Sequence, residues 1–122
     1  MKRLTRYAAV GAAATAAHYA LMALAVEAAH WPAWLASGAG ALLGAQIAFW
    51  ANRRYTFAHR GPAGPAWVRF HVTAGAGALL GMALVAVGVR AGQHYLLAQG
   101  IATVAVMLAT FAVNRAWAFS GR

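Results

Sequence analysis

The sequence predicts an all-α membrane protein with four transmembrane helices, arranged as two parallel two-helix repeats with both termini cytoplasmic. Three observations predict this fold class. The chain of 122 residues is 63% hydrophobic and only 9% charged, and four long runs within it carry no charge. Nearly all Lys and Arg residues lie on one side of these runs. A six-residue pattern, Asn-Arg-x-aromatic-x-Phe, occurs near the end of each half.

The uncharged runs have the length of membrane spans. They cover residues 7–26, 28–52, 70–89 and 91–114. About 20 apolar residues cross a hydrocarbon core of ~30 Å, so we expect helices at about 7–28, 33–52, 69–89 and 93–113. The first run is too long for a cleavable signal, and another span follows at once. A soluble domain carries about 25% charged residues, so we predict a single transmembrane domain over residues 1–122.

Basic residues orient the predicted helices. Nine Lys and Arg residues lie before the first helix, between the second and third, or after the fourth: Lys2, Arg3, Arg6, Arg53, Arg54, Arg60, Arg69, Arg115 and Arg122. The opposite side holds Arg90 alone. Because cytoplasmic loops are enriched in Lys and Arg, both termini are predicted to be cytoplasmic in the inner membrane. The short links near 29–32 and 90–93 are predicted to be external.

The two halves of the chain repeat the same order of features. Arg6-Tyr7 begins the first half and Arg69-Phe70 begins the second. The first repeat covers about residues 6–57 and the second about 69–119, joined by a Gly- and Pro-containing cytoplasmic linker, 58–68. Each repeat has two helices, so both have the same orientation and are related by an axis along the membrane normal.

The repeated motif carries a family resemblance. It reads Asn52-Arg53-Arg54-Tyr55-Thr56-Phe57 and then Asn114-Arg115-Ala116-Trp117-Ala118-Phe119, and it contains both Asn residues of the chain. With the four spans and the basic-aromatic start of each repeat, it resembles the GtrA-like membrane proteins over about residues 6–119. The resemblance implies a part in cell-surface polysaccharide synthesis. It implies that the protein moves a polyprenyl-phosphate-linked sugar to the outer leaflet, beside a membrane glycosyltransferase.

A lipid-linked sugar of this kind needs a phosphate site and a polar path. Arg suits phosphate because its planar guanidinium donates two parallel hydrogen bonds. We predict a cytoplasmic phosphate-binding cluster made of Asn52, Arg53, Arg54, Asn114, Arg115, Arg6 and Arg69. A second interpretation stays open: these Arg residues are also what a positive-inside topology requires. Asn, for its part, can end a helix in the left-handed conformation.

Polar residues within the spans are the candidates for the sugar path. His18 and Gln46 are predicted to line a polar groove, with a hydrogen bond between helices as the alternative. Glu27 and Arg90 are predicted at the outer mouth, either as a pair or as its closure. Weaker polar positions are Thr15, Thr73, Gln99, Thr103 and Thr110, and their Thr hydroxyls are expected to bond to their own helix.

Several classes of function are disfavoured. The net charge of +9 would suit nucleic acid, but the charges flank the spans, so the expected surroundings are membrane lipids. Catalysis is not expected, because the chain has one acidic residue and no Cys. The five His residues are scattered without ligand spacing, so no metal or other cofactor is expected.

Two alternative functions and one question of assembly remain open. The protein could anchor or assemble a polyprenyl-phosphate glycosyltransferase without transport. A small multidrug-type exporter fits less well, since Glu27 is shallow and the orientation bias is strong. Two Gly-xxx-Gly steps, Gly40 with Gly44 and Gly77 with Gly81, predict close helix packing. The partner helix could lie in this chain or in a second copy, which would make a homodimer.

Overall fold

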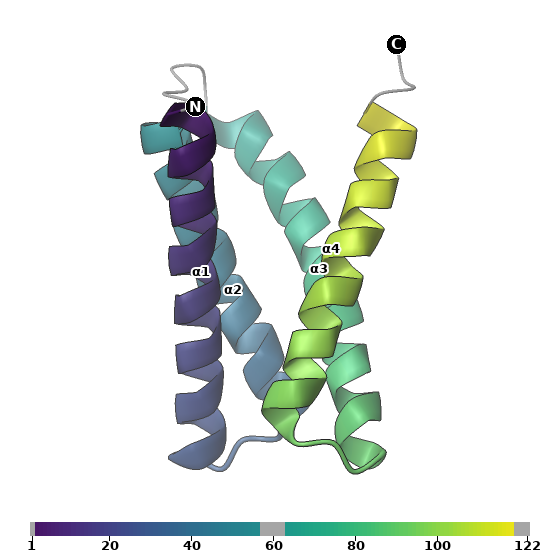
Figure 1. Cartoon of the computed structure of the whole chain (residues 1–122). Helices are drawn as coiled ribbons and strands as arrows, with labels where there is room; N and C mark the ends of the chain where they lie inside the picture. Colours follow the sequence, from purple (N-terminus) through teal and green to yellow (C-terminus); the bar gives the residue numbers. More distant parts are fainter. Residues whose placement is uncertain (1, 57–62, 119–122) are drawn as a thin grey trace.

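The protein forms four α-helices that run alternately up and down (Figure 1). The computed structural model describes residues 2–56 and 63–118. The helices are α1 (Lys2–Glu27), α2 (Ala33–Ala51), α3 (Ala63–Arg90) and α4 (Tyr95–Ala118), and a π-helical turn, η1 (Asn52–Thr56), follows α2. The expectation of four helices is confirmed.

Three of these helices are long and apolar enough to cross a membrane. Within the described residues, the candidate spans are Leu4–Glu27, Ala33–Arg54 and Trp67–Arg90. A shorter apolar stretch in α4 covers Tyr95–Thr110. The lengths of the three candidate spans agree with the hydrocarbon thickness of a bilayer.

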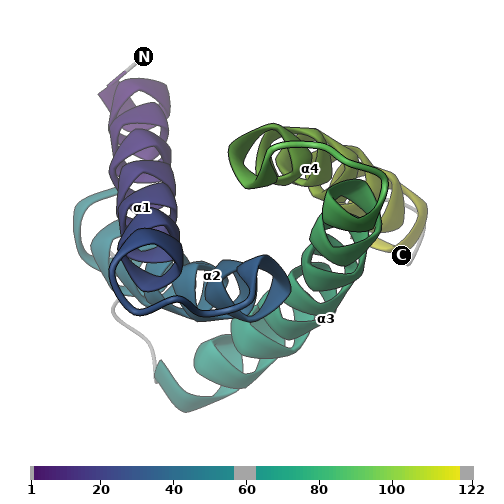
Figure 2. The same cartoon turned by 90° about the horizontal axis from the view of Figure 1, so that it is seen from below.

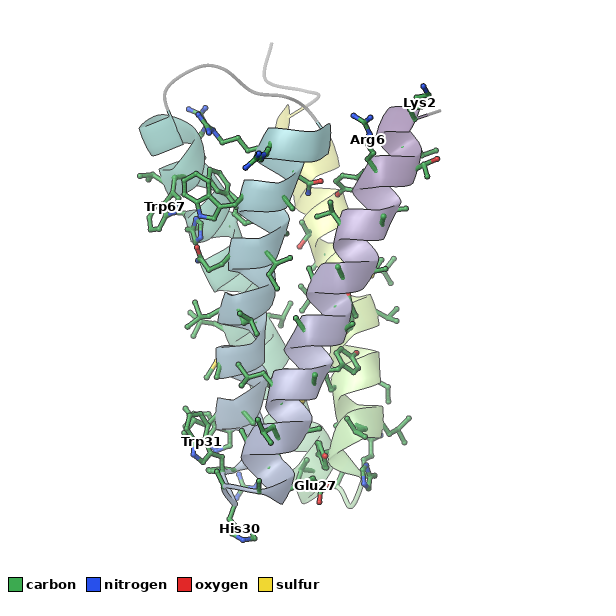
Figure 3. All side chains as sticks on the ribbon, turned by 90° about the vertical axis from the view of Figure 1, so that its left-hand side faces the viewer. Lys2, Arg6, Glu27, His30, Trp31 and Trp67 are labelled. Carbon is green, nitrogen blue, oxygen red and sulfur yellow. The ribbon has the colours of Figure 1, made fainter. Side chains whose placement is uncertain are left out.

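The helices are arranged as an arc in sequence order (Figure 2). α1 packs against α2, α2 against α3, and α3 against α4. The start of α1, η1, the start of α3 and the end of α4 share one end of the bundle, which we call the basic end. Lys2 and Arg6 lie there, and Glu27 and His30 lie at the opposite end, which we call the hairpin end (Figure 3).

The helices extend further at the basic end than the sequence predicted. α3 begins at Ala63 rather than near residue 69. Pro65 does not prevent this, because the first turn of a helix has no intrahelical partners for its N–H groups. α1 likewise begins at Lys2.

Neither motif Asn ends a helix in the left-handed conformation. Asn52 has φ −66° and ψ −40°, and its backbone N–H reaches the carbonyl oxygens of Ala48 and Phe49. The chain therefore continues from α2 into η1 without reversing. In the second repeat, α4 runs through Asn114 to Ala118. The interpretation of Asn as a left-handed helix stop is wrong.

The two hairpins reverse the chain in similar ways. His30 has φ 60° in the first and Gly92 has φ 96° in the second, 62 residues apart. The Trp31 N–H donates to the Ala25 carbonyl and the Gln93 N–H to the Gly88 carbonyl, each at 3.0 Å. Positive φ is unusual for a residue with a Cβ, although His is among those that tolerate it.

Glycines bring the helices close together within this one chain. A Cβ added to Gly40 would lie 2.5 Å from the His18 carbonyl oxygen, and one on Gly44 would lie 3.1 Å from that of Ala14. These contacts join α2 to α1. On α3, a Cβ at Gly77 would lie 3.1 Å from Val106 of α4. The partners of both Gly steps are thus in the same chain.

The buried core lies in the half of the bundle nearer the hairpin end. Its members are Met22, Ala25, Ala36, Val85, Ala98 and Ala102. Met22 and Val85 are fully buried and stand 63 residues apart, and the buried Ala36 and Ala98 stand 62 apart. Large apolar side chains are exposed elsewhere on all four helices. That exposure is expected of a surface that contacts lipid rather than water.

Candidate cleft between the four helices

All four helices line one cleft of about 630 Å³. Much of its wall is Ala and Gly, whose small side chains leave the space open. Its polar lining residues are Tyr7, Thr15, His18, Ser37, Arg69, Thr73, Gln99, Thr103 and Thr110. The described lining residues contain no acidic side chain, so the cleft has a neutral polar interior with Arg69 as its cation.

A hydrogen-bonded group of four side chains, which we call the polar floor, lies deep in the bundle. It consists of Tyr19, Ser37, Gln99 and Thr103. The Ser37 hydroxyl donates to Gln99 Oε1 at 2.5 Å, and Gln99 Nε2 donates to Thr103 Oγ1 at 3.1 Å. The Tyr19 and Thr103 hydroxyls are 2.7 Å apart. Ser37 and Gln99 are each only 2% exposed, and burial without these bonds would be costly.

His18 stands beside the polar floor and lines the cleft, as predicted. Its ring lies edge-on to that of Tyr19, with centroids 5.3 Å apart. Its Nε2 is buried and has no hydrogen-bond partner among the described residues. A buried polar atom of this kind normally has a partner, and His18 Nε2 is an exception among the described residues.

Gln46 lies outside the cleft, contrary to the prediction that it lines a groove. Its Nε2 is 2.7 Å from His71 Nε2, which joins α2 to α3. The other ring nitrogen of His71 is 2.9 Å from the Trp67 carbonyl oxygen. A carbonyl can only accept, so His71 Nδ1 carries the proton and Nε2 accepts from Gln46. Gln46 therefore makes the interhelical hydrogen bond that was the alternative.

Helix phase explains the different positions of His18 and Gln46. The α2 residues that line the cleft include Ser37, Ala41, Gly44 and Ala48, which follow one another at helical spacing. Gln46 is two residues from Gly44 and from Ala48, and so lies on the opposite face of α2. A sequence that is apolar on every face does not reveal which side of the helix is inward.

The predicted phosphate-binding residues are spread over the basic end. Among those whose side chains are described, Arg69 lines the cleft, and Asn52, Arg53, Arg54 and Arg6 are not part of its lining. The Arg53 guanidinium lies 5.9 Å from the Trp50 ring centroid. The side chains of Asn114 and Arg115 fall outside the described residues. A single cluster of all seven residues stays a prediction.

The hairpin end is closed by a bond that the sequence did not predict. The Tyr95 hydroxyl donates to Glu27 Oε2 at 2.8 Å, which joins α4 to α1. Arg90 is exposed at the end of α3. In the described residues Glu27 and Arg90 form no ion pair, so the predicted pairing is wrong. Glu27 lies at the hairpin end with Tyr95 as its partner (Figure 3), and its place at an outer mouth stays a prediction.

Ser37 and Tyr19 were not predicted from the sequence as members of a polar site, and Thr103 was expected only to bond its own helix. Thr103 Oγ1 does donate to the Gln99 carbonyl at 2.9 Å, and Thr73 Oγ1 to that of Arg69 at 3.1 Å. The signal that would have revealed the polar floor is spacing. Ser37 and Gln99 stand 62 residues apart, which is the repeat offset of the two motifs. The described residues contain no group of three potential metal ligands.

The comparison with protein families agrees with the helices and the motif. Residues 6–119 match the family described as GtrA/DPMS, transmembrane domain. No curated protein and no solved structure matches the chain. The match covers nearly the whole chain, including the four cleft-lining helices. The chain therefore belongs to the GtrA/DPMS transmembrane domain family, as a multi-pass membrane protein of a family implicated in cell-surface polysaccharide synthesis.

Proposed function

We propose that the protein moves a polyprenyl-phosphate-linked monosaccharide from the cytoplasmic to the outer leaflet for cell-surface polysaccharide glycosylation. The observation that carries this proposal is the cleft of about 630 Å³ lined by all four helices. Its volume is within the range of about 300–1,000 Å³ found for small-molecule sites. Its polar lining gives a sugar a path that the apolar bilayer lacks. Membership of the GtrA/DPMS transmembrane domain family supports this substrate class.

The proposed orientation puts the basic end in the cytoplasm. Nine of the ten Lys and Arg residues belong to that side by their place in the sequence, and the positive-inside rule favours it. A membrane glycosyltransferase that makes the lipid-linked sugar on the cytoplasmic face of the inner membrane would then deliver it at the basic end.

Arg69 is the proposed contact for the lipid phosphate inside the cleft. It lines the cleft and is itself exposed, so its guanidinium can donate to a phosphate without first losing all its water. Two parallel donors suit a phosphodiester. The other basic-end residues (Arg6, Arg53, Arg54, Arg115, with Asn52 and Asn114) would surround the phosphate as it leaves the headgroup region.

The sugar is proposed to bind at His18 and the polar floor. Sugar hydroxyls both donate and accept, and the floor presents hydroxyl and amide groups that do the same. The His18 side chain lines the cleft beside these groups. These neutral groups replace bonds to water and hold the sugar loosely enough for release.

We also propose that the two halves are parallel repeats about an axis along the membrane normal. Buried residues recur at offsets of 62 or 63, as with Met22 and Val85. Ser37 and Gln99, which are 62 apart, bond to each other. Equivalent residues meet in this way where a two-fold axis passes between them. These observations support the repeat.

The experiment is a leaflet-exposure assay with the purified full chain in liposomes. Polyprenyl phosphate carrying a fluorescently labelled glucose, galactose or mannose is placed in both leaflets, and a membrane-impermeant quencher is added outside. The proposal expects quenching to pass from about half toward all of the probe, faster than in protein-free liposomes. Rates equal to those of protein-free liposomes for every sugar would instead support the non-transporting anchor. A homodimer would be detected in the same preparation by its mass in detergent.

A further inference from the structure

We propose that the seam between α1 and α4 is the lateral portal through which the polyprenyl chain remains in the bilayer while its phosphate and sugar occupy the cleft. This inference rests on the proposed function. The sugar needs polar surroundings and the chain needs hydrocarbon, so the bound lipid must pass out between two helices. The structure distinguishes the four seams by what holds each one together.

Two of the seams are closed by direct helix packing. Between α1 and α2, a Cβ on Gly40 would lie 2.5 Å from backbone and side-chain atoms of His18. Between α3 and α4, a Cβ on Gly88 would lie 2.8 Å from the Ala98 Cβ. Contacts this short leave no room for a lipid chain at these depths, and Gly77, whose added Cβ would lie 3.1 Å from Val106, extends the α3–α4 contact toward the middle of the bundle. Beyond it α3 and α4 lean apart toward the basic end (Figure 1).

The seam between α2 and α3 is held at the basic end. Gln46 and His71 are hydrogen bonded across it at 2.7 Å. Phe49, only 7% exposed, packs against Phe70 with ring centroids 5.4 Å apart. Phe49 also packs edge-on against the His71 ring, with centroids 5.6 Å apart. Polar and aromatic contacts together close this seam at the depth where the lipid would enter.

The seam between α1 and α4 differs, because the helix pairs that pack against each other in the described chain are α1 with α2, α2 with α3 and α3 with α4. The Tyr19 hydroxyl contacts Thr103, and Glu27 accepts from Tyr95. Toward the basic end the two helices diverge (Figures 1 and 2). There the cleft-lining Tyr7 of α1 is 53% exposed, and Met107 of α4 is 65% exposed.

Gly11 is an open position on α1 close to the cleft-lining residues. It lies four residues after Tyr7 and three before Ala14, both of which line the cleft, so it belongs to the same helical stripe. A Cβ placed on it would meet nothing within 4 Å. Tyr7 and Met107 both line the cleft and are exposed, so the cleft reaches the surface on these two helices, and Gly11 leaves α1 without a side chain nearby.

The first test maps the chain of the lipid on the unaltered protein. The probe is polyprenyl-phosphate glucose with a photoreactive diazirine on its polyprenyl tail, irradiated in liposomes, and labelled residues are identified by mass spectrometry. Label that concentrates on α1 and α4 around Gly11 and Met107, and falls when unlabelled probe competes, supports the portal. Competed label at Phe49 and Phe70, or spread evenly around the bundle, overturns it.

The second test plugs the seam with a matched control. Gly11→Trp is expected to lower the leaflet-exposure rate at least about tenfold, since a bulky side chain in the path raises the barrier. Gly75→Trp on α3 is the control, because its Cβ would also meet nothing within 4 Å and Gly75 does not line the cleft. Equal rates for the two variants, with an active wild-type protein, overturn the portal alone. An inactive wild-type protein overturns the proposed transport.

Discussion

Among the described residues, Arg69 is the basic residue that the fold brings to the cleft. Arg6, which occupies the corresponding position in the first half of the sequence, is not part of the lining. At this depth α1 lines the cleft with the next residue, Tyr7, whereas α3 lines it with both Arg69 and Phe70. At the scale of single residues, the cation that faces the cleft is therefore set by how each side chain is placed in the assembled bundle and not by the motif.

Replacing Arg69 with Ala is therefore expected to weaken binding of polyprenyl phosphate about tenfold or more, because hydrogen bonds to a charged partner contribute roughly 1.5–3 kcal/mol. Arg69→Lys should recover part of the loss, since a single ammonium lacks the planar fork. Binding is measured by equilibrium titration in detergent. Arg90→Ala, which removes the same charge at the hairpin end, is the control, and an equal loss in both would refute a local role.

The polar floor is expected to act on the sugar rather than on the phosphate. Thr103→Val keeps the side-chain shape and removes the hydroxyl, and should weaken binding of polyprenyl-phosphate glucose by about threefold to tenfold. Binding of sugar-free polyprenyl phosphate should not change. Thr73→Val is the matched control, because that hydroxyl donates to its own helix at Arg69. A parallel loss for both ligands in Thr103→Val would show a structural effect.

At the scale of helices, packing depends on positions where a side chain has no room. The α1–α2 contact is built around Gly40 and Gly44, which let the α2 backbone approach the His18 and Ala14 carbonyls. Between membrane helices this packing acts through dispersion and close fit, since lipid is as apolar as the side chains it replaces. The same contact fixes the place of His18 beside the cleft.

Gly40→Ala should destabilise the bundle by about 1–3 kcal/mol, because the added methyl group forces α1 and α2 apart. Gly100→Ala is the control: a Cβ there meets nothing within 4 Å, and Ala is favoured over Gly in helices by up to ~1 kcal/mol. Thermal unfolding in detergent, followed by circular dichroism, measures both. The prediction fails if Gly40→Ala unfolds at or above the wild-type temperature.

At the scale of the whole molecule, the arc of helices has a closed end and an open end. Tyr95 and Glu27 join α4 to α1 at the hairpin end, and the polar floor joins them again nearer the centre. The basic end has diverging helices and Arg69. If the basic end is cytoplasmic, this is the conformation that accepts substrate, and release requires the bonds at Tyr19 and Glu27 to open.

The final prediction follows from the proposed orientation, with the basic end in the cytoplasm. Reporter fusions after Arg122 and within Arg60–Gly64 should both report a cytoplasmic position, because nine of ten Lys and Arg residues lie on that side. An external signal from either fusion would reverse the proposed direction of transport and remove the parallel repeat. A fusion near His30, in the first hairpin, should report the outside and serves as the control.

The sequence by itself determined the four helices, their approximate bounds and the family. These features depend on local properties: run length, the placement of charge, and the motif with its 62-residue offset. Each can be read without knowing which residues meet. His18 could be recognised for the same reason, since a polar residue in the middle of a span has few alternatives to facing protein.

The tertiary structure decided which polar residues share the cleft. His18 and Gln46 look equivalent in sequence, yet one borders the polar floor and the other bonds His71 on the opposite face of α2. Glu27 bonds Tyr95 rather than Arg90 for a similar reason, because the arc brings α4 to α1 at the hairpin end. In a chain that is apolar on all faces, helix rotation and tilt follow from packing at small residues, and only the assembled bundle fixes them.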